Sequence, residues 1–200
     1  MIDAFADVLA AAKIGDPAAL TVLYRALNPG VERYIRGRAP DAAEDLAADA
    51  WIAVAAALPR FEGDEDDFRG WVYTIARNLV IDDHRRAQRR PEEADPVGLN
   101  DDPEGADLDS MHGTDRGAVA PAESSVIDAL DAEAVVALVR RLPPDQADVI
   151  MLRVIGGLDT ERVASVLGKR AGTIRVLQHR GLRNLERLLG DRSRGMDDEA

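Results

Sequence analysis

The sequence contains no cysteine, few aromatic residues and no long apolar segment. Its 200 residues include 4% Phe, Trp and Tyr and no Cys. The missing thiols exclude a disulfide framework, a thiolate metal site and a thiol redox sensor within this chain. No apolar run approaches the ~18 residues needed to cross a bilayer, and no basic leader opens the chain. We therefore expect a cytoplasmic protein of one or two small domains, without membrane insertion.

Basic residues are also in the minority. The chain has 37 Asp and Glu against 25 Lys and Arg, a formal net charge of −12. The excess is local, because residues 92–133 hold 13 carboxylates and a single base, Arg116. Elsewhere acids and bases are equal in number, and 17 of the bases lie within residues 71–91 and 134–200. Such local basic segments inform about partners far more than the total charge does.

Helical periodicity runs through the chain, and we find no alternating strand pattern. Asp16-Pro17 predicts a helix start, and Pro29-Gly30 predicts a kink or an interruption of that helix. Apolar residues in 68–80 recur at offsets of 3, 4, 7, 11 and 12, which trace one face of a helix. The predicted fold class is therefore all-α.

Two compact helical units are predicted, with a linker between them. Residues 1–91 form the first domain and residues 126–190 the second. Residues 92–125 contain prolines, glycines and acids with almost no large apolar side chain, a composition that cannot offset the entropy of ordering. We expect this segment to be a flexible acidic linker, and residues 191–200 to be a disordered tail.

The second domain ends in a predicted helix-turn-helix. Residues 159–167 and 172–189 are predicted as two helices joined by a short turn that contains Gly168. On the second helix, a basic stripe recurs every four residues: Arg175, His179, Arg183 and Arg187. These donors can contact phosphates, and arginine can also bind a guanine edge. The alternative is a solvated basic face on a packing helix, but the preceding capped helix and tight turn favour DNA binding.

Patterns typical of catalysis are missing. The three histidines, His84, His112 and His179, have no partner at the spacing of a metal pair. No nucleophile elbow, phosphate loop or dinucleotide fingerprint occurs. The acidic run in residues 62–67 lacks the spacing of a calcium loop, so a solvated loop is favoured. We expect no enzymatic activity, no cofactor and no metal.

Three stretches of the sequence resemble conserved segments of group IV, or extracytoplasmic-function, RNA polymerase sigma factors. FRGWVYTIARNLVIDDHRR at 68–86 resembles their second conserved segment, and AEDLAADAW at 43–51 resembles the polymerase-binding helix before it. LPPDQADVIMLRVIGGLDTERVASVLG and GTIRVLQHRGLRNL, within 142–185, resemble their C-terminal domain. The resemblance covers nearly all of residues 10–190 outside the linker. It implies sigma2-like and sigma4-like helical domains that bind core RNA polymerase and direct it to promoter DNA.

The resemblance also assigns roles to three groups of side chains. On the helix that docks on the polymerase clamp lie Glu44, Asp45, Asp49 and Trp51. On the helix that melts and binds the minus-ten element lie Trp71, Arg77, Asn78, Asp82, His84, Arg85 and Arg86, although the spacing of Trp71 favours a core position. On the helix that contacts the minus-thirty-five element lie Arg170, Thr173, Arg175, Val176, His179, Arg180 and Arg183.

The sequence departs from the family pattern at three places. The loop at residues 62–67 is far more acidic than usual, which weakens the expected capture of an unstacked base without polymerase. Ala48 stands where a glutamine is usual, which removes one polymerase hydrogen bond. Lys169 and Arg170 replace an aliphatic residue and a serine, so the recognition helix loses its usual N-cap. The promoter sequence therefore cannot be transferred from relatives.

The resemblance further implies control by an anti-sigma protein, with the chain monomeric when free or bound to that partner one to one. Two other hypotheses remain open. The first is a helix-turn-helix regulator that binds duplex DNA alone, without polymerase. The second is a protein that binds only other proteins, which would leave the basic stripe unexplained. The segment at 43–51 and the basic helix at 68–86 favour a sigma factor, because a repressor needs neither.

Overall fold

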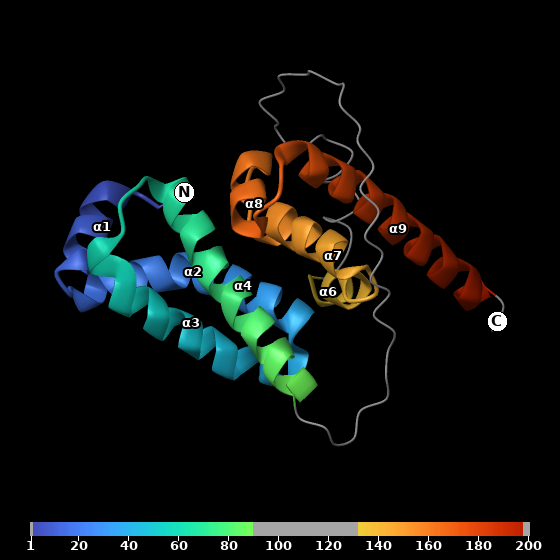
Figure 1. Cartoon of the computed structure of the whole chain (residues 1–200), viewed down its shortest axis with the longest axis horizontal. Helices are drawn as coiled ribbons and strands as arrows, with labels where there is room; N and C mark the ends of the chain where they lie inside the picture. Colours follow the sequence, from blue (N-terminus) through green and yellow to red (C-terminus); the bar gives the residue numbers. More distant parts are fainter. Residues whose placement is uncertain (1, 90–131, 198–200) are drawn as a thin grey trace.

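The computed structural model of the chain describes the backbone of residues 2–89 and 132–197, and the side chains of 2–89 and 136–190. Every regular element within these ranges is helical, which confirms the predicted all-α fold class. Figure 1 shows α1–α4 gathered in one group and α6–α9 in a second group beside it. The predicted linker at 92–125 lies outside the described residues. Within the described part of the chain, no helix is both long and apolar enough to span a bilayer.

The first group contains four α-helices and two short 3₁₀ turns. These are α1 (Phe5–Lys13), α2 (Pro17–Arg38), η1 (Pro40–Ala42), α3 (Ala43–Ala57), η2 (Leu58–Arg60) and α4 (Glu65–Arg89). The predicted start of α2 is confirmed, because the Asp16 carboxylate accepts from the Ala18 N–H at 2.7 Å and Pro17 occupies the first turn.

The predicted interruption of α2 at Pro29 is wrong. The helix continues through Pro29 to Arg38. Proline removes one backbone donor from the helix, but Val31, Tyr34 and Ile35 in the following turns are fully buried. Their packing offsets the missing hydrogen bond, so tertiary contacts outweigh the local preference of proline here.

The core of the first group is rich in aromatic rings. Phe68 on α4 is fully buried, and its ring lies 5.8 Å from Phe5, 5.4 Å from Phe61 and 5.8 Å from Trp71, measured between centroids. Aromatic pairs at such spacings stabilise a core beyond the area they bury. This cluster fixes α4, the predicted minus-ten helix, against α1 and η2.

The second group contains four α-helices and one π-helical turn. These are α6 (Ala132–Val139), α7 (Pro144–Ile150), η3 (Met151–Ile155), α8 (Thr160–Leu167) and α9 (Ala171–Asp197). The sequence pattern places the end of α9 at Leu189 and a disordered tail from residue 191. The helix instead continues to Asp197, since no proline follows residue 171 to interrupt it.

The two groups pack against each other. Helix α4 lies against α8, and α2 lies against α6 and η3. Gly37 on α2 permits this approach, because a Cβ at that position would lie 2.8 Å from Cε of Met151. Met151 itself is fully buried. The sequence predicts two separate domains, and their mutual packing is a result of the structure.

Candidate nucleic-acid interfaces

The helix-turn-helix is built as its sequence predicts. Asp159 caps α8 by accepting from the Arg162 N–H at 2.7 Å. Helix α8 ends at Leu167 and is capped by Gly168, whose φ of +64° is a left-handed conformation that favours glycine. Helix α9 then begins at Ala171 and packs through the buried side chains of Ile174 and Leu185. These two side chains orient α9 so that its opposite face is open to solvent.

All seven predicted minus-thirty-five residues are exposed around this open face. They are Arg170, Thr173, Arg175, Val176, His179, Arg180 and Arg183. Within the turn, Lys169 forms an ion pair with Asp145 at 2.8 Å. The Arg170 carbonyl accepts the Ile174 N–H at 3.1 Å, and the Arg170 side chain is exposed. Arg175 lies 3.5 Å from Glu161 of α8, an exposed pair that water and salt weaken.

The predicted minus-ten residues on α4 fall into two classes. Trp71 and Arg77 are half-buried. The Trp71 ring packs 5.0 Å from Phe61, in agreement with a largely structural role. Five side chains are exposed along the outer part of the helix: Asn78, Asp82, His84, Arg85 and Arg86. By helical spacing four of these share one face, namely Asn78, Asp82, Arg85 and Arg86, whereas His84 lies on the side of α4 that faces the end of α2.

Two local contacts order the C-terminal half of α4. His84 Nε2 lies 2.9 Å from the Arg38 carbonyl oxygen, which ties α4 to the end of α2. Arg85 pairs with Asp82 at 3.3 Å, one helical turn earlier. Arg85 therefore has an acidic neighbour in the free protein, whereas Arg86 and Asn78 are exposed without such a pair in the described contacts.

The acidic loop, residues 62–67, closes the start of α4. The Asp67 N–H donates to Asp64 Oδ1 at 2.8 Å, and the Asp64 N–H donates to Asp67 Oδ2 at 3.1 Å. This reciprocal pair is a capping box made from two aspartates. The hydrogen bond from the Asp67 backbone, aided by Arg162, holds the pKa of Asp64 below its usual value. Among the described residues no group of three or more acids and histidines is arranged to hold a metal.

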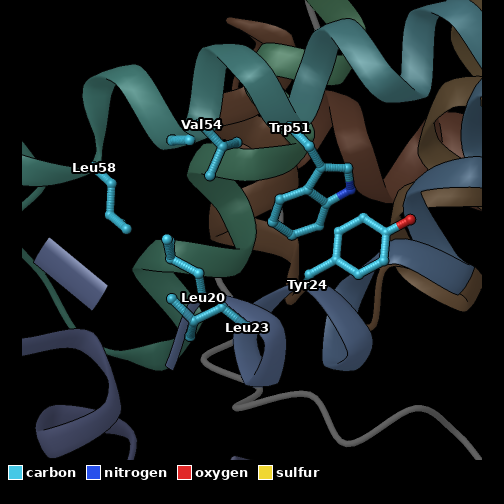
Figure 2. Close-up of a pocket in the computed structure, with 7 residues that line it drawn as sticks. Leu20, Leu23, Tyr24, Trp51, Val54 and Leu58 are labelled. Atoms are coloured by element: carbon cyan, nitrogen blue, oxygen red, sulfur yellow. The ribbon is translucent and has the colours of Figure 1, made fainter. Parts of the chain in front are cut away.

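The predicted polymerase-binding residues lie on α3. Glu44, Asp45 and Asp49 are exposed, and Trp51 is half-buried. The Trp51 ring meets Tyr24 of α2 edge to face, with centroids 5.0 Å apart. Figure 2 shows these two rings closing one end of a groove that is otherwise lined by aliphatic side chains. The groove has a volume of about 170 Å³.

The structure adds three residues to the predicted polymerase-binding surface on α3 and the adjoining part of α2. They are Asn28, Tyr24 and Ile52. Asn28 Oδ1 accepts a hydrogen bond from Trp51 Nε1 at 2.9 Å, across a separation of 23 positions. Tyr24 is 42% exposed and Ile52 is 67% exposed. Helical spacing predicts which residues share a face of one helix, but no local signal pairs a position on α2 with a position on α3. A hollow of about 470 Å³ beside Trp51 also includes Glu32 and Ala48.

Comparisons with known proteins identify both halves of the chain. The model of Sigma-70 region 2 matches residues 23–90, and that of Sigma-70, region 4 matches residues 132–185. Over 190 residues the chain is 33% identical to the ECF RNA polymerase sigma factor BldN of Streptomyces coelicolor, spanning 94% of this chain and 67% of BldN. It is 32% identical over 185 residues to SigD of Mycobacterium tuberculosis, spanning 90% of this chain and 81% of SigD.

Solved structures share the fold. CnrH in complex with the cytosolic domain of CnrY superposes with a TM-score of 0.60 at 20% identity, over 92% of this chain and 96% of CnrH. RpoE of Bartonella quintana, in complex with the anti-sigma factor NepR, superposes with a TM-score of 0.60 at 24% identity, over 84% and 94%. The matched segments contain the three groups of side chains described above, in the predicted order. The chain belongs to the ECF RNA polymerase sigma factors.

Proposed function

We propose that this sigma factor binds core RNA polymerase through the α2–α3 face and directs it to promoters through α4 and α9. One observation carries the assignment of residues. The same chain exposes a basic recognition helix on its C-terminal domain and an acidic, aromatic face on its N-terminal domain. A regulator that acts on DNA alone needs the first surface and has no use for the second.

Recognition of the minus-thirty-five element is assigned to α9. A helix of this kind fits the major groove of duplex DNA, where arginine can donate to O6 and N7 of guanine. Arg175 and His179 are both exposed and one turn apart, so they reach neighbouring base pairs. Arg170 and Arg183, at either end of the exposed face, supply phosphate contacts that set the position of the helix on the duplex.

Recognition of the minus-ten element is assigned to α4 and the loop before it. This element is bound as a melted strand, so the protein needs cations for the backbone and a pocket for an unstacked base. Arg85 and Arg86 supply exposed positive charge. Asn78 supplies donors and acceptors on the same surface. The acidic loop gives little attraction for a phosphate backbone, so strand capture depends on melting within the polymerase complex.

Polymerase binding is assigned to α3 with the adjoining part of α2. Glu44, Asp45 and Asp49 supply exposed negative charge, which increases the rate of encounter with a basic partner surface. Trp51 and Tyr24 supply a partly exposed aromatic pair next to an apolar groove (Figure 2). Aromatic anchors beside a charged rim are typical of protein interfaces in which a few residues dominate the affinity.

We also propose that an anti-sigma protein controls this chain. Two proteins of the same fold, CnrH and RpoE of Bartonella quintana, were solved with CnrY and with the anti-sigma factor NepR. By analogy the free chain is a monomer, or a one-to-one complex with such a partner. Since its other partners are polymerase and promoter DNA, its place of action is the cytoplasm. The proposed function consists only of binding to polymerase, DNA and an anti-sigma protein, so we propose no enzymatic activity, cofactor or metal.

The test is a pull-down of the purified protein with core polymerase, followed by run-off transcription from a genomic promoter library. Stable association together with new and specific transcripts would support the proposal and would also define the promoter sequence. A protein that ignores polymerase but shifts duplex DNA alone would be a helix-turn-helix regulator. A protein inactive in both assays, even after purification away from any partner, would contradict the proposed function.

A charge-reversal variant tests the polymerase face within the same assay. The double substitution Asp45→Arg and Asp49→Arg should remove association with core polymerase, because it replaces exposed acids with bases at the proposed contact. The matched control is Asp3→Arg with Asp7→Arg, which reverses two exposed acids at the start of the chain. If polymerase association survives the first pair as well as the second, the assignment of α3 is wrong.

A further inference from the structure

One acid of the helix-turn-helix contacts the exposed face of α9. Glu161 lies in the first turn of α8, and its Oε1 is 3.5 Å from Arg175 Nη2. Both side chains are exposed, to 68% for Glu161 and 49% for Arg175. Among the described contacts, Arg175 is the one predicted minus-thirty-five residue that forms an ion pair. Because the two residues belong to different helices, the pair depends on how α8 packs on α9.

The backbone on both sides of this pair is held firmly. Asp159 caps α8 by accepting a backbone N–H at 2.7 Å, which fixes the turn that carries Glu161. Val163, two residues further along α8, is fully buried, and so is Ile174, which immediately precedes Arg175 on α9. Helices α8 and α9 lie against each other in the second domain (Figure 1). The carboxylate and the guanidinium therefore meet across a packed junction.

The other acid at the start of α8 is engaged elsewhere. Asp159 Oδ2 lies 2.7 Å from Arg162 Nη1, and the same guanidinium contacts Asp64 and Asp67 of the first domain at 3.5 Å and 3.3 Å. Glu161 is the neighbouring acid, and its contact in the structure is with α9. Of the two carboxylates in this turn, Glu161 is therefore the one that faces the recognition helix.

The pair adds little to the stability of the free protein, because water screens two exposed charges and both long side chains lose freedom. Contact with DNA changes this balance. A duplex that covers α9 excludes water, and the attraction between the two charges grows as the local dielectric falls. At the same time a carboxylate beside the phosphates weakens binding to DNA of any sequence. A group that opposes general binding while it strengthens one local contact favours selection among sequences.

The chemistry of arginine allows it to contact Glu161 and DNA together. A guanidinium has five N–H donors, so one can contact the Glu161 carboxylate while others bind O6 and N7 of a guanine. A free arginine side chain loses rotamer freedom when it binds, and a partner that holds it beforehand reduces that loss. A guanidinium held in this way also turns less readily toward the acceptors of another base pair. The wrong base therefore loses more binding than the right one.

We propose that Glu161 is a positioning residue for promoter recognition, whose carboxylate directs the Arg175 guanidinium onto one guanine of the minus-thirty-five element. Glu161 acts through Arg175 and does not read a base itself. This inference rests on the proposed function, because it takes α9 to be the helix that reads the duplex. It adds a residue of α8 to a set of predicted residues that lie on the turn and on α9.

The test is a base-preference profile of the holoenzyme reconstituted from the full chain and core polymerase. Run-off transcription is measured on the promoter that the library yields and on versions with each single base change in its minus-thirty-five element. The position at which Arg175→Ala alters the profile identifies the guanine that Arg175 reads. Glu161→Gln keeps the size of the side chain and removes its charge. At that position it should lower the preference for guanine about fivefold, the upper range for one surface ion pair, and leave the other positions unchanged.

Two controls separate positioning from other effects of the charge. The matched variant is Glu186→Gln, which removes an exposed acid from α9. It should change transcription from all the promoters alike and leave the base profile as it was. In a chain that already carries Arg175→Ala, Glu161→Gln should have no further effect on the profile, because the two residues act as one unit. The urea midpoint of Glu161→Gln should match that of the native chain, since both members of the pair are exposed.

Three results would overturn the proposal. A profile that Arg175→Ala alters and Glu161→Gln does not would refute positioning and leave promoter recognition by α9 intact. A profile that Glu161→Gln still alters after Arg175 has been replaced would show that Glu161 reads DNA directly. A profile that Arg175→Ala leaves unchanged would show that α9 does not read this element through Arg175, so that part of the proposed function would fail together with this inference.

Discussion

The two domains differ most in their aromatic content. All eight Phe, Trp and Tyr residues lie within the first 73 positions, and none follows. The N-terminal core is built on rings such as Phe68 and Tyr73, whereas the C-terminal core is aliphatic, with Leu152, Val163 and Ile174 fully buried. These rings are buried, so the difference lies in how each core holds its proposed DNA-binding helix: α4 through aromatic contacts such as Phe61 with Phe68, and α9 through aliphatic side chains such as Ile174.

Removing one core side chain from each domain tests whether the two cores are independent. Phe68→Ala should lower the free energy of unfolding by about 3–5 kcal/mol, because it leaves a cavity among aromatic rings. Leu152→Ala in the other core should cost about 2–5 kcal/mol. Urea denaturation followed by circular dichroism measures both. Since α2 and α4 pack on the second domain, we expect each variant to shift one common transition.

Two separate transitions in that experiment, each moved by only one variant, would contradict a shared core.

Removing donors from α9 distinguishes its proposed DNA surface from the proposed polymerase face. The double substitution Arg175→Ala and His179→Ala should lower activity at promoters with the native minus-thirty-five element, by about 1–3 kcal/mol of binding free energy for each base that α9 no longer reads. Polymerase binding should be unchanged, since α9 and α3 belong to different groups of helices (Figure 1). Run-off transcription and a pull-down measure the two effects. A variant that fails in both assays would point to misfolding instead.

The two aspartate caps offer a smaller comparison between the domains. Asp16 caps α2 and Asp159 caps α8, each through hydrogen bonds to backbone N–H groups. Replacing either by alanine should cost about 1 kcal/mol of stability. Asp159→Ala should cost more than Asp16→Ala, because it also releases Arg162, which pairs with Asp159 at 2.7 Å and lies 3.3 Å from Asp67 of the first domain. Urea denaturation measures both costs. Equal costs would mean that Arg162 adds nothing to the packing of the two domains.

The smallest effect concerns pH and the acidic loop. The pKa of Asp64 is held below its usual 3.8 by the Asp67 backbone and by Arg162. A lowered folded pKa adds stability above the ordinary pKa, which is lost as the pH falls through the folded value. The difference in unfolding free energy between the native chain and Asp64→Asn should therefore be constant at neutral pH and shrink below about pH 4. A difference independent of pH would mean that ionisation of Asp64 plays no part.

Local signals predicted much of the C-terminal site. Asp159 and Gly168 each act through their own backbone neighbours, so the cap and the helix end were both visible in the sequence. The exposed face of α9 followed from helical spacing alone. Pro29 was misleading because its local preference is weak compared with the burial of Val31 and Tyr34 on the same helix. The partly buried state of Arg77 among the predicted minus-ten residues was also hidden, since its partner Asp148 lies on the other domain.

The sequence by itself determined the helical class, the order of the conserved segments, and which side chains share a face of α3, α4 and α9. These properties depend on residues three or four positions apart, whose geometry a helix dictates. Only the tertiary structure decided that Trp51 meets Tyr24, and that Asp148 faces Tyr34 across a separation of 114 positions. Such contacts depend on how whole helices pack, and packing is selected by the shape and volume of the complete core.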